Sequence, residues 1–287
     1  MLGIRPSGIY VDATLGGGGH SRAILSELGP DGRLIVFDQD RDAMANAPSD
    51  SRVTAVRANF RFIHHFLHYM GIDGVDGILA DLGVSSHQFD TPERGFSFRF
   101  DSSLDMRMNT SSSESAAHLL NTCSEDRLAD ILRLYGEVDG SRRASALICR
   151  AREKAPIQTT ADLNKALETI LPPVAPHKFL AKVYQALRIE VNGEMRSLVR
   201  LLDGIRDSLK PSGTAVIITY HSLEDRMVKN FFKTGNVNGT YTADLYGRRS
   251  TPFTVITRKP ILPGGNEVAG NTRARSAKLR AARRTES

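Results

Sequence analysis

Four consecutive glycines, Gly16–Gly19, stand in the segment DATLGGGGHS. Each glycine loses much backbone entropy when it is ordered, so the run predicts a loop to which another group approaches closely. A phosphate-binding P-loop would continue with Lys and then Ser or Thr, and a dinucleotide fingerprint would need a third glycine at position 21 or 22. Those positions hold Ser21 and Arg22. The sequence therefore disfavours a nucleoside triphosphate and leaves NAD as a weaker alternative.

A carboxylate follows at the spacing expected for ribose recognition. Asp38 ends the apolar run RLIVFD, 20 residues after Gly18. An acid at this place accepts hydrogen bonds from a ribose diol. A ligand with a ribose but no pyrophosphate fits both features, and S-adenosylmethionine is the common one. The alternative for Asp38 is a cap on the helix expected near Arg41.

Polar residues also follow a later apolar run that ends at Asp81. The segment DLGVSS supplies the Asp81 carboxylate and the hydroxyls of Ser85 and Ser86. They stand where a group transferred from such a ligand would meet its acceptor, although capping of the following turn is the alternative for Asp81 and Ser85. Phe60 follows another strand pattern, and it either packs on an adenine ring or belongs to the core.

The elements that must position these residues form an alternating pattern. Strands are expected at 9–13, 33–38, 53–56, 77–81 and 214–219, with helices at 21–28, 42–47, 61–70 and 183–209. Strands that are apolar throughout and separated by helices indicate a parallel sheet covered on both faces. The fold class is therefore α/β with a doubly wound core, and its ligands bind at the carboxyl ends of the strands.

The alternation breaks in the middle of the chain. Residues 85–109 form a polar stretch without a regular period, and residues 111–182 show helical spacing only. The sequence therefore predicts a core of residues 1–107 and 183–287, interrupted by a helical insertion at 108–182.

Composition narrows the class of protein. The chain has 287 residues, 40% hydrophobic and 24% charged, with no apolar run long enough for a membrane helix and no signal-peptide pattern at its start. Its two cysteines form no metal-binding motif, which favours a reducing, cytosolic compartment and no metal. The net charge is +6, and the tail from residue 271 to 287 contributes six cations and one acid. The tail is either a solvated, frayed helix or a segment that grips nucleic-acid phosphates.

Seven motifs, taken in order, resemble the RsmH (MraW) methyltransferases: DATLGGGGHS, DLGVSSHQFD, ERGFSF, LDMRM, QALRIEVNGE, HSLEDR and NTRARSAKLR. The resemblance spans nearly the whole chain. It implies a Rossmann-like class I methyltransferase core with an inserted helical domain. It also implies an S-adenosylmethionine-dependent enzyme that methylates the exocyclic N4 amine of one cytidine in the decoding region of 16S rRNA.

The resemblance also implies site residues. The cofactor contacts would be Gly18, Gly19, His20, Asp38, Phe60, Asp81 and Gln88. Because the methyl group is transferred to an amine, we expect Asp81, or a backbone carbonyl beside it, to accept a hydrogen bond from the N4 amine, with Ser85, Ser86 and His221 as further catalytic candidates. A helix cap is the alternative for His221.

The RNA side of the site is less determined. Phe96 and Phe98 alternate with cations, which suits base stacking, although two aromatics that fold a loop onto the core fit equally well. Further RNA candidates are Arg107, Arg188, Asn192, Arg273, Arg275 and Lys278. Two rival functions stay open at this point: a non-catalytic rRNA-binding or ribosome assembly factor, and an NAD-dependent oxidoreductase. The sequence does not distinguish a monomer from a homodimer.

Overall fold

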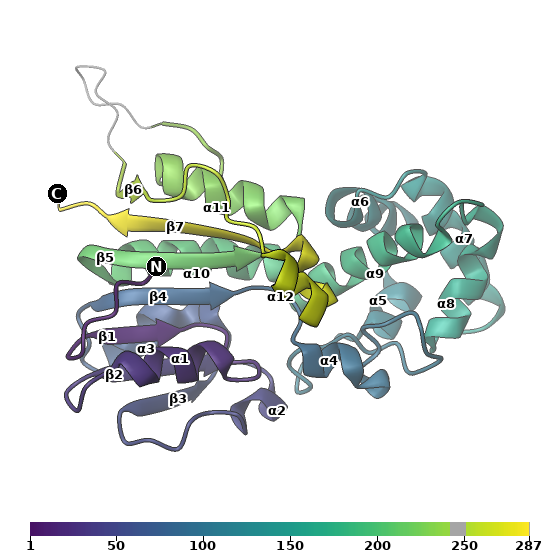
Figure 1. Cartoon of the computed structure of the whole chain (residues 1–287). Helices are drawn as coiled ribbons and strands as arrows, with labels where there is room; N and C mark the ends of the chain where they lie inside the picture. The colour runs from purple at the N-terminus through teal and green to yellow at the C-terminus, as the bar shows by residue number, and fades with distance from the viewer. Residues whose placement is uncertain (242–250, 287) are drawn as a thin grey trace. The chain divides into compact units, whose positions relative to one another are not determined.

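The computed structural model describes residues 1–241 and 251–286 and divides into two compact units. The first unit comprises Met1–Gly83 and Met195–Ser287, and the second comprises Val84–Glu194. The colours of Figure 1 show that the second unit is an insertion, because the chain leaves the first unit and later returns to it.

The first unit is built on a seven-stranded sheet in the order β3-β2-β1-β4-β5-β7-β6. The strands are β1 (Ile9–Asp12), β2 (Arg33–Asp38), β3 (Val53–Arg57), β4 (Val75–Asp81), β5 (Leu209–Thr219), β6 (Phe253–Val255) and β7 (Lys278–Arg284). The first five strands are parallel, while β7 pairs antiparallel with both β5 and β6. This is a doubly wound, Rossmann-like sheet, as the alternation of strands and helices predicts.

Alternate strand residues pack on opposite faces of this sheet. Val11, Ile35 and Phe37 point to one face, and there they pack with residues of α3 (Ile63–Tyr69), α10 (Glu194–Ser208) and α11 (Ser222–Thr234). Tyr10 and Leu34 point to the other face, toward α1 (Gly19–Glu27), α2 (Arg41–Met44) and the first residues of the chain. Among the described residues, this unit also contains α12 (Gly265–Gly270). Both faces are buried, which explains the near-continuous apolar strands.

The second unit is helical. Its helices are α4 (Ser86–Asp90), α5 (Ala116–Thr122), α6 (Glu125–Gly136), α7 (Ser141–Lys154), α8 (Thr160–Leu167) and α9 (Pro176–Asn192). The unit starts and ends outside the expected insertion 108–182, because the polar stretch before it contributes to its core. Phe96, Leu104 and Met106 are buried among residues of α5 to α9.

One expected helix is divided in two. The pattern over residues 183–209 predicts a single helix, but α9 ends at Asn192 and α10 begins at Glu194. Gly193 lies between them with a φ of 57°, in the left-handed region that glycine adopts without steric cost. The apolar period is helical on both sides of this glycine, so the periodicity alone does not reveal the break.

The basic tail is neither a frayed helix nor wholly exposed. Its residues Lys278–Arg284 form β7, whose Ala281 and Ala282 are fully buried. Arg280 is also buried, and its Nε donates to Asp225 Oδ1 at 2.6 Å, while Lys278 Nζ lies 3.7 Å from Asp225 Oδ2. Burial alone would raise the pKa of Asp225, but the hydrogen bonds and charge of Arg280, with Lys278, hold it below its usual value. Part of the tail's charge therefore stabilises the fold.

We expect the Arg280→Ala variant to lose about 2 kcal/mol of unfolding free energy, because Asp225 keeps only the weaker charge interactions with Lys278 and Lys229. Arg275, which is exposed, supplies the control, and Arg275→Ala should change stability by less than about 0.5 kcal/mol. Urea unfolding of both variants measures the difference. Equal stabilities would show that the buried ion pair contributes nothing net.

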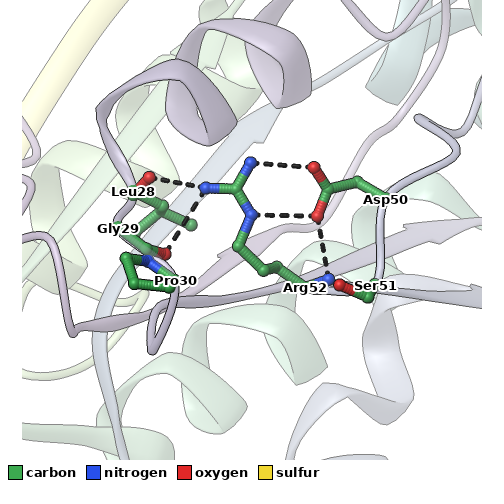
Figure 2. A pocket seen from close by; sticks show the side chains of 6 residues that line it. All are labelled: Leu28, Gly29, Pro30, Asp50, Ser51 and Arg52. Atoms are coloured by element: carbon green, nitrogen blue, oxygen red, sulfur yellow. Dashed lines mark hydrogen bonds and ion pairs between the residues drawn. The ribbon is translucent and has the colours of Figure 1, made fainter.

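A pocket of about 510 Å³ lies between the end of α1 and the start of β3 (Figure 2). Arg52 crosses it: Nε and Nη2 donate to the two oxygens of Asp50, and Nη1 donates to the Leu28 carbonyl at 2.5 Å. The hydrogen bonds from Arg52 lower the pKa of Asp50 to about 2. The pocket is near the amino ends of β2 and β3, so it lies away from the strand ends where doubly wound folds bind ligands. We interpret the Arg52 interactions as contacts that stabilise the fold, and the pocket as no ligand site.

Among the described residues, no helix is both long enough and apolar enough to cross a bilayer.

Candidate cofactor and methyl-transfer site

The glycine run forms a tight loop between β1 and α1. Gly16 and Gly18 have φ angles of 48° and 74°, in the left-handed region that other residues adopt at a cost. The loop is fixed from both sides: Gly18 N donates to the Leu15 carbonyl at 2.7 Å, and Asn46 Nδ2 donates to the Gly16 carbonyl at 2.8 Å. The loop follows β1, which is the neighbour of β4 in the sheet, and the strand order reverses between these two strands.

The loop leaves open space where a ligand would approach. A Cβ added to Gly16, Gly17 or Gly19 would meet no atom within 4 Å. A Cβ on Gly18 would instead lie 2.7 Å from the Asn46 carbonyl oxygen. Gly18 is therefore required by the fold of the loop itself. The absence of side chains at Gly17 and Gly19 keeps the backbone accessible, which fits the methionine end of S-adenosylmethionine.

Asp38 lies at the carboxyl end of β2, beside this loop. Its Oδ2 accepts from Gly16 N at 2.9 Å, and its Oδ1 accepts from Asp40 N at 2.9 Å. Burial raises the pKa of Asp38 despite these hydrogen bonds. Asp40, and not Asp38, caps α2, because its side chain accepts from Asp42 N. The capping alternative for Asp38 is therefore wrong, and beside its backbone hydrogen bonds from Gly16, Gln39 and Asp40 the carboxylate retains acceptor capacity for a ribose hydroxyl.

Phe60 follows β3 and is half-buried against the core of the sheet. It begins η1 (Phe60–Phe62), which Asn59 caps by accepting from Arg61 N. The Asn59 amide also donates to Gln39 Oε1 at 2.8 Å, which ties the ends of β2 and β3 together. Phe60 thus serves as a core contact, and its exposed part leaves room for the predicted adenine contact.

Asp81, at the end of β4, is held by two elements. Tyr220 donates its hydroxyl to Asp81 Oδ1 at 2.8 Å, and the backbone N–H of Asp81 donates to Thr14 Oγ1 at 2.6 Å. His20 Nε2 lies 3.6 Å from Asp81 Oδ2. The hydrogen bond and charge of Asp81 raise the pKa of His20, and burial followed by the charge of Asp81 raises that of Tyr220. The structure brings Asp81 and His20 together, and the contact of each with the cofactor stays a prediction.

Behind this pair, Asp12 is fully buried at the end of β1. Its Oδ2 accepts from the Ser21 hydroxyl at 2.6 Å, and its Oδ1 accepts from Thr14 N at 3.1 Å. Burial raises the pKa of Asp12 to about 6, although the two hydrogen bonds oppose this shift. Asp12 thereby connects two segments: the start of α1, which carries His20, and Thr14, whose hydroxyl accepts from the backbone N–H of Asp81.

The raised pKa predicts a pH dependence of stability. The native state holds the Asp12 proton more tightly than the unfolded chain, whose value is 3.8, so protonation stabilises the fold. This contribution is fully present below about pH 4 and is lost as the pH rises through about 6. Chemical denaturation of the wild type and of Asp12→Asn between pH 4 and 7 measures it. The difference between the two proteins should change across that window, and a constant difference would contradict the assignment.

His221 is the N-cap of α11. Its Nδ1 accepts from Glu224 N at 3.5 Å, while the Glu224 carboxylate accepts from the backbone of Tyr220 at 2.9 Å. The side chain of His221 is only 7% exposed, with Nε2 at 3.2 Å from Glu224 Oε1. The capping alternative is therefore what the structure shows. A catalytic contribution from His221 remains a prediction.

Three predicted residues belong to the second unit and are described within it. Ser85 caps α4: its hydroxyl accepts from Gln88 N at 3.2 Å, and Gln88 Oε1 accepts from Ser85 N at 3.1 Å. Ser86 is the first residue of that helix. Gln88 is buried, so its carbonyl oxygen orders the turn. Their approach to the cofactor or the substrate stays a prediction.

The RNA candidates of the second unit are mostly engaged in its packing. Arg188 forms two hydrogen bonds with Glu194, and Asn192 Oδ1 accepts from Met108 N at 2.7 Å. Arg107 pairs with Asp105. Phe96 is buried, and Phe98 packs edge-on against Tyr184 with ring centroids 5.5 Å apart. The structure thus shows the core alternative for both phenylalanines.

The sequence did not single out Tyr220, Asp12 or Thr14. Tyr220 stands immediately before the HSLEDR motif, and the other two lie within DATLGGGGHS. The strand order, which places β4 between β1 and β5, brings these three residues near Asp81. Polar residues at the ends of three strands could have indicated this cluster, because the carboxyl ends of parallel strands lie at one edge of the sheet.

This sheet, with its antiparallel β7, an open glycine loop after β1 and an acid at the end of β2, matches the fold of methyltransferases that depend on S-adenosylmethionine. The chain belongs to the MraW methylase family, whose sequence model matches residues 1–285.

Curated relatives share this family. A protein from Bacteroides fragilis (strain YCH46), named ribosomal RNA small subunit methyltransferase H, is 54% identical over 281 residues, which cover 98% of this chain and 92% of the relative. The protein of the same name from Flavobacterium johnsoniae is 51% identical, with coverage of 98% and 93%. The crystal structure of an rRNA methylase from Streptococcus thermophilus is 11% identical, covers 99% of this chain and 90% of that chain, and gives a TM-score of 0.41.

Proposed function

We propose that this chain transfers a methyl group from S-adenosylmethionine to the exocyclic N4 amine of one cytidine in the decoding region of 16S rRNA. One observation carries the proposal: an open glycine loop and Asp38 lie on one side of the strand-order reversal, and a fixed carboxylate, Asp81, lies on the other. The names of relatives about half identical to the chain support the rRNA substrate. The proposal places the reaction in the cytoplasm, where ribosomal subunits assemble.

The described residues of the first unit suit the cofactor. The backbone of Gly18, Gly19 and His20 would hold its methionine end, Asp38 would accept from the ribose, and Phe60 would contact the adenine. When bound, S-adenosylmethionine supplies an electrophilic methyl group on a sulfonium. We place Gln88 at the same ligand, as the family resemblance implies.

The protein must orient and deprotonate a weak nucleophile. The lone pair of the cytosine N4 amine is delocalised into the ring, so alignment and exclusion of water supply much of the rate. Asp81 is suited to accept a proton or hydrogen bond from the amine, because Tyr220 holds one of its oxygens in place. Ser85, Ser86 and His221 would shape the base pocket around it.

The target base must leave its stack to reach Asp81, and an unpaired or loosely stacked base costs least to extrude. Arg273 and Arg275 lie in η4 (Thr272–Ser276), where both are exposed, and they would contact backbone phosphates. Lys278, whose Nζ lies 3.7 Å from Asp225 Oδ2, would contact a phosphate as well as this carboxylate. We propose the small ribosomal subunit as the setting, and a monomer or a homodimer satisfies the proposal equally.

Methyl transfer from labelled S-adenosylmethionine tests the proposal. Small ribosomal subunits that lack the modification, naked 16S rRNA and large subunits are offered separately. Label in the 16S RNA of the first or second substrate, and none in large subunits, is the expected result. Cofactor binding without label in any RNA would favour the non-catalytic assembly factor instead.

A further inference from the structure

The outer face of η1 and α3 carries planar side chains in succession. The guanidinium carbon of Arg61 lies 4.6 Å from the centroid of the Phe62 ring. The Phe62 and His65 ring centroids are 6.3 Å apart, and those of His65 and His64 are 6.1 Å apart. All four side chains are exposed, and one turn farther along Tyr69 is 87% exposed. We call these five residues the α3 surface.

The segment that carries the α3 surface contains no acid, and the next acid along the chain is Asp73. From Val53 to Ile72 the chain contains two arginines and three histidines but no Asp or Glu. In its last two turns, α10, the helix whose Gly204 packs against α3, carries two acids, Asp203 and Asp207. Both lie within ion-pair distance of Arg206, at 3.3 and 2.9 Å. These two acids therefore share a cation of their own helix.

These features together match the chemistry of single-stranded RNA. Bases stack on aromatic rings and on guanidinium planes, while nearby cations contact the phosphates. The exposed side chains of residues 61–69 are all cationic or aromatic, and none is aliphatic. The surface also begins directly after Phe60 in the chain, the proposed adenine contact.

We propose that the α3 surface binds a single-stranded segment of the RNA substrate flanking the methylated base. This inference rests on the proposed function. It assigns substrate recognition to the first unit, in addition to the η4 arginines.

Two variants separate stacking from charge. Phe62→Leu keeps an apolar side chain but removes the aromatic face, and Arg61→Ala removes the cation above it. Arg33→Ala is the matched control, because Arg33 is an exposed arginine at the opposite, amino end of β2. We measure KM and kcat with small subunits, the affinity for a labelled single-stranded decoding-region RNA by anisotropy, and the affinity for S-adenosylmethionine.

We expect both variants to raise KM and weaken RNA binding about fivefold relative to Arg33→Ala. The kcat and the cofactor affinity should not change. RNA affinities within twofold of the control would overturn the proposal. A change in sedimentation without a change in RNA affinity would also overturn it, and would assign the surface to a second copy. If the wild type methylates no RNA, the proposed function fails, while anisotropy still decides the surface.

Discussion

Replacing Asp81 with Asn should lower kcat for methyl transfer by about 100-fold or more, the range that a positioned proton acceptor contributes. The amide keeps one acceptor oxygen, which Tyr220 engages, and presents N–H donors where the carboxylate accepted. Single-turnover rates at saturating subunits and cofactor measure the effect. Affinity for S-adenosylmethionine is measured separately, because Asp81 also borders the cofactor site.

Tyr220→Phe is the matched control for this prediction. It keeps the Asp81 carboxylate and removes one hydrogen bond to it. A reduction of about tenfold is expected, since a single neutral donor to a charged acceptor contributes about 1.5 kcal/mol. An Asp81→Asn enzyme that binds the cofactor normally and turns over at the wild-type rate would exclude a carboxylate role.

The second large effect concerns two adjacent glycines with different tasks. Gly18→Ala should destabilise the first unit by about 2–4 kcal/mol, because it combines left-handed strain with a contact to the Asn46 carbonyl. The Cβ of Gly19→Val would meet no protein atom within 4 Å, and we expect this variant to leave stability within about 1 kcal/mol. It should nevertheless weaken S-adenosylmethionine binding about 10- to 100-fold by occupying the ligand's space.

Thermal unfolding and calorimetric titration of the two glycine variants separate these tasks. Gly17→Ala serves as a control for the loop, since Gly17 also has free space around it and is not a predicted contact. Normal cofactor affinity in Gly19→Val would show that the open space lies away from the ligand.

The core of the sheet is predictable from the sequence because burial on both faces makes its strands continuously apolar. The β2 residues Arg33–Asp38 coincide with the expected strand, and the order of strands and helices follows. The strand β7 was not predicted, because its alternating Arg and Ala resemble a solvated tail. Its burial depends on Asp225, a partner 55 residues away from Arg280.

The site is partly predictable for a similar reason. The glycines, Asp38 and Asp81 mark strand ends, and the sequence reveals strand ends. Tyr220 was missed because its role depends on strand order, which brings the end of β5 beside β4. The local capping roles of His221 and Ser85 compete with catalytic ones, and spacing alone does not separate them.

The most direct test of the central claim identifies the methylated nucleoside. Small subunits lacking the modification are incubated with labelled S-adenosylmethionine and the wild-type chain, and their RNA is digested to nucleosides. The account predicts that the label elutes as N4-methylcytidine, and that Asp81→Asn nearly abolishes it. Label in any other nucleoside, or none despite normal cofactor binding, would contradict the account.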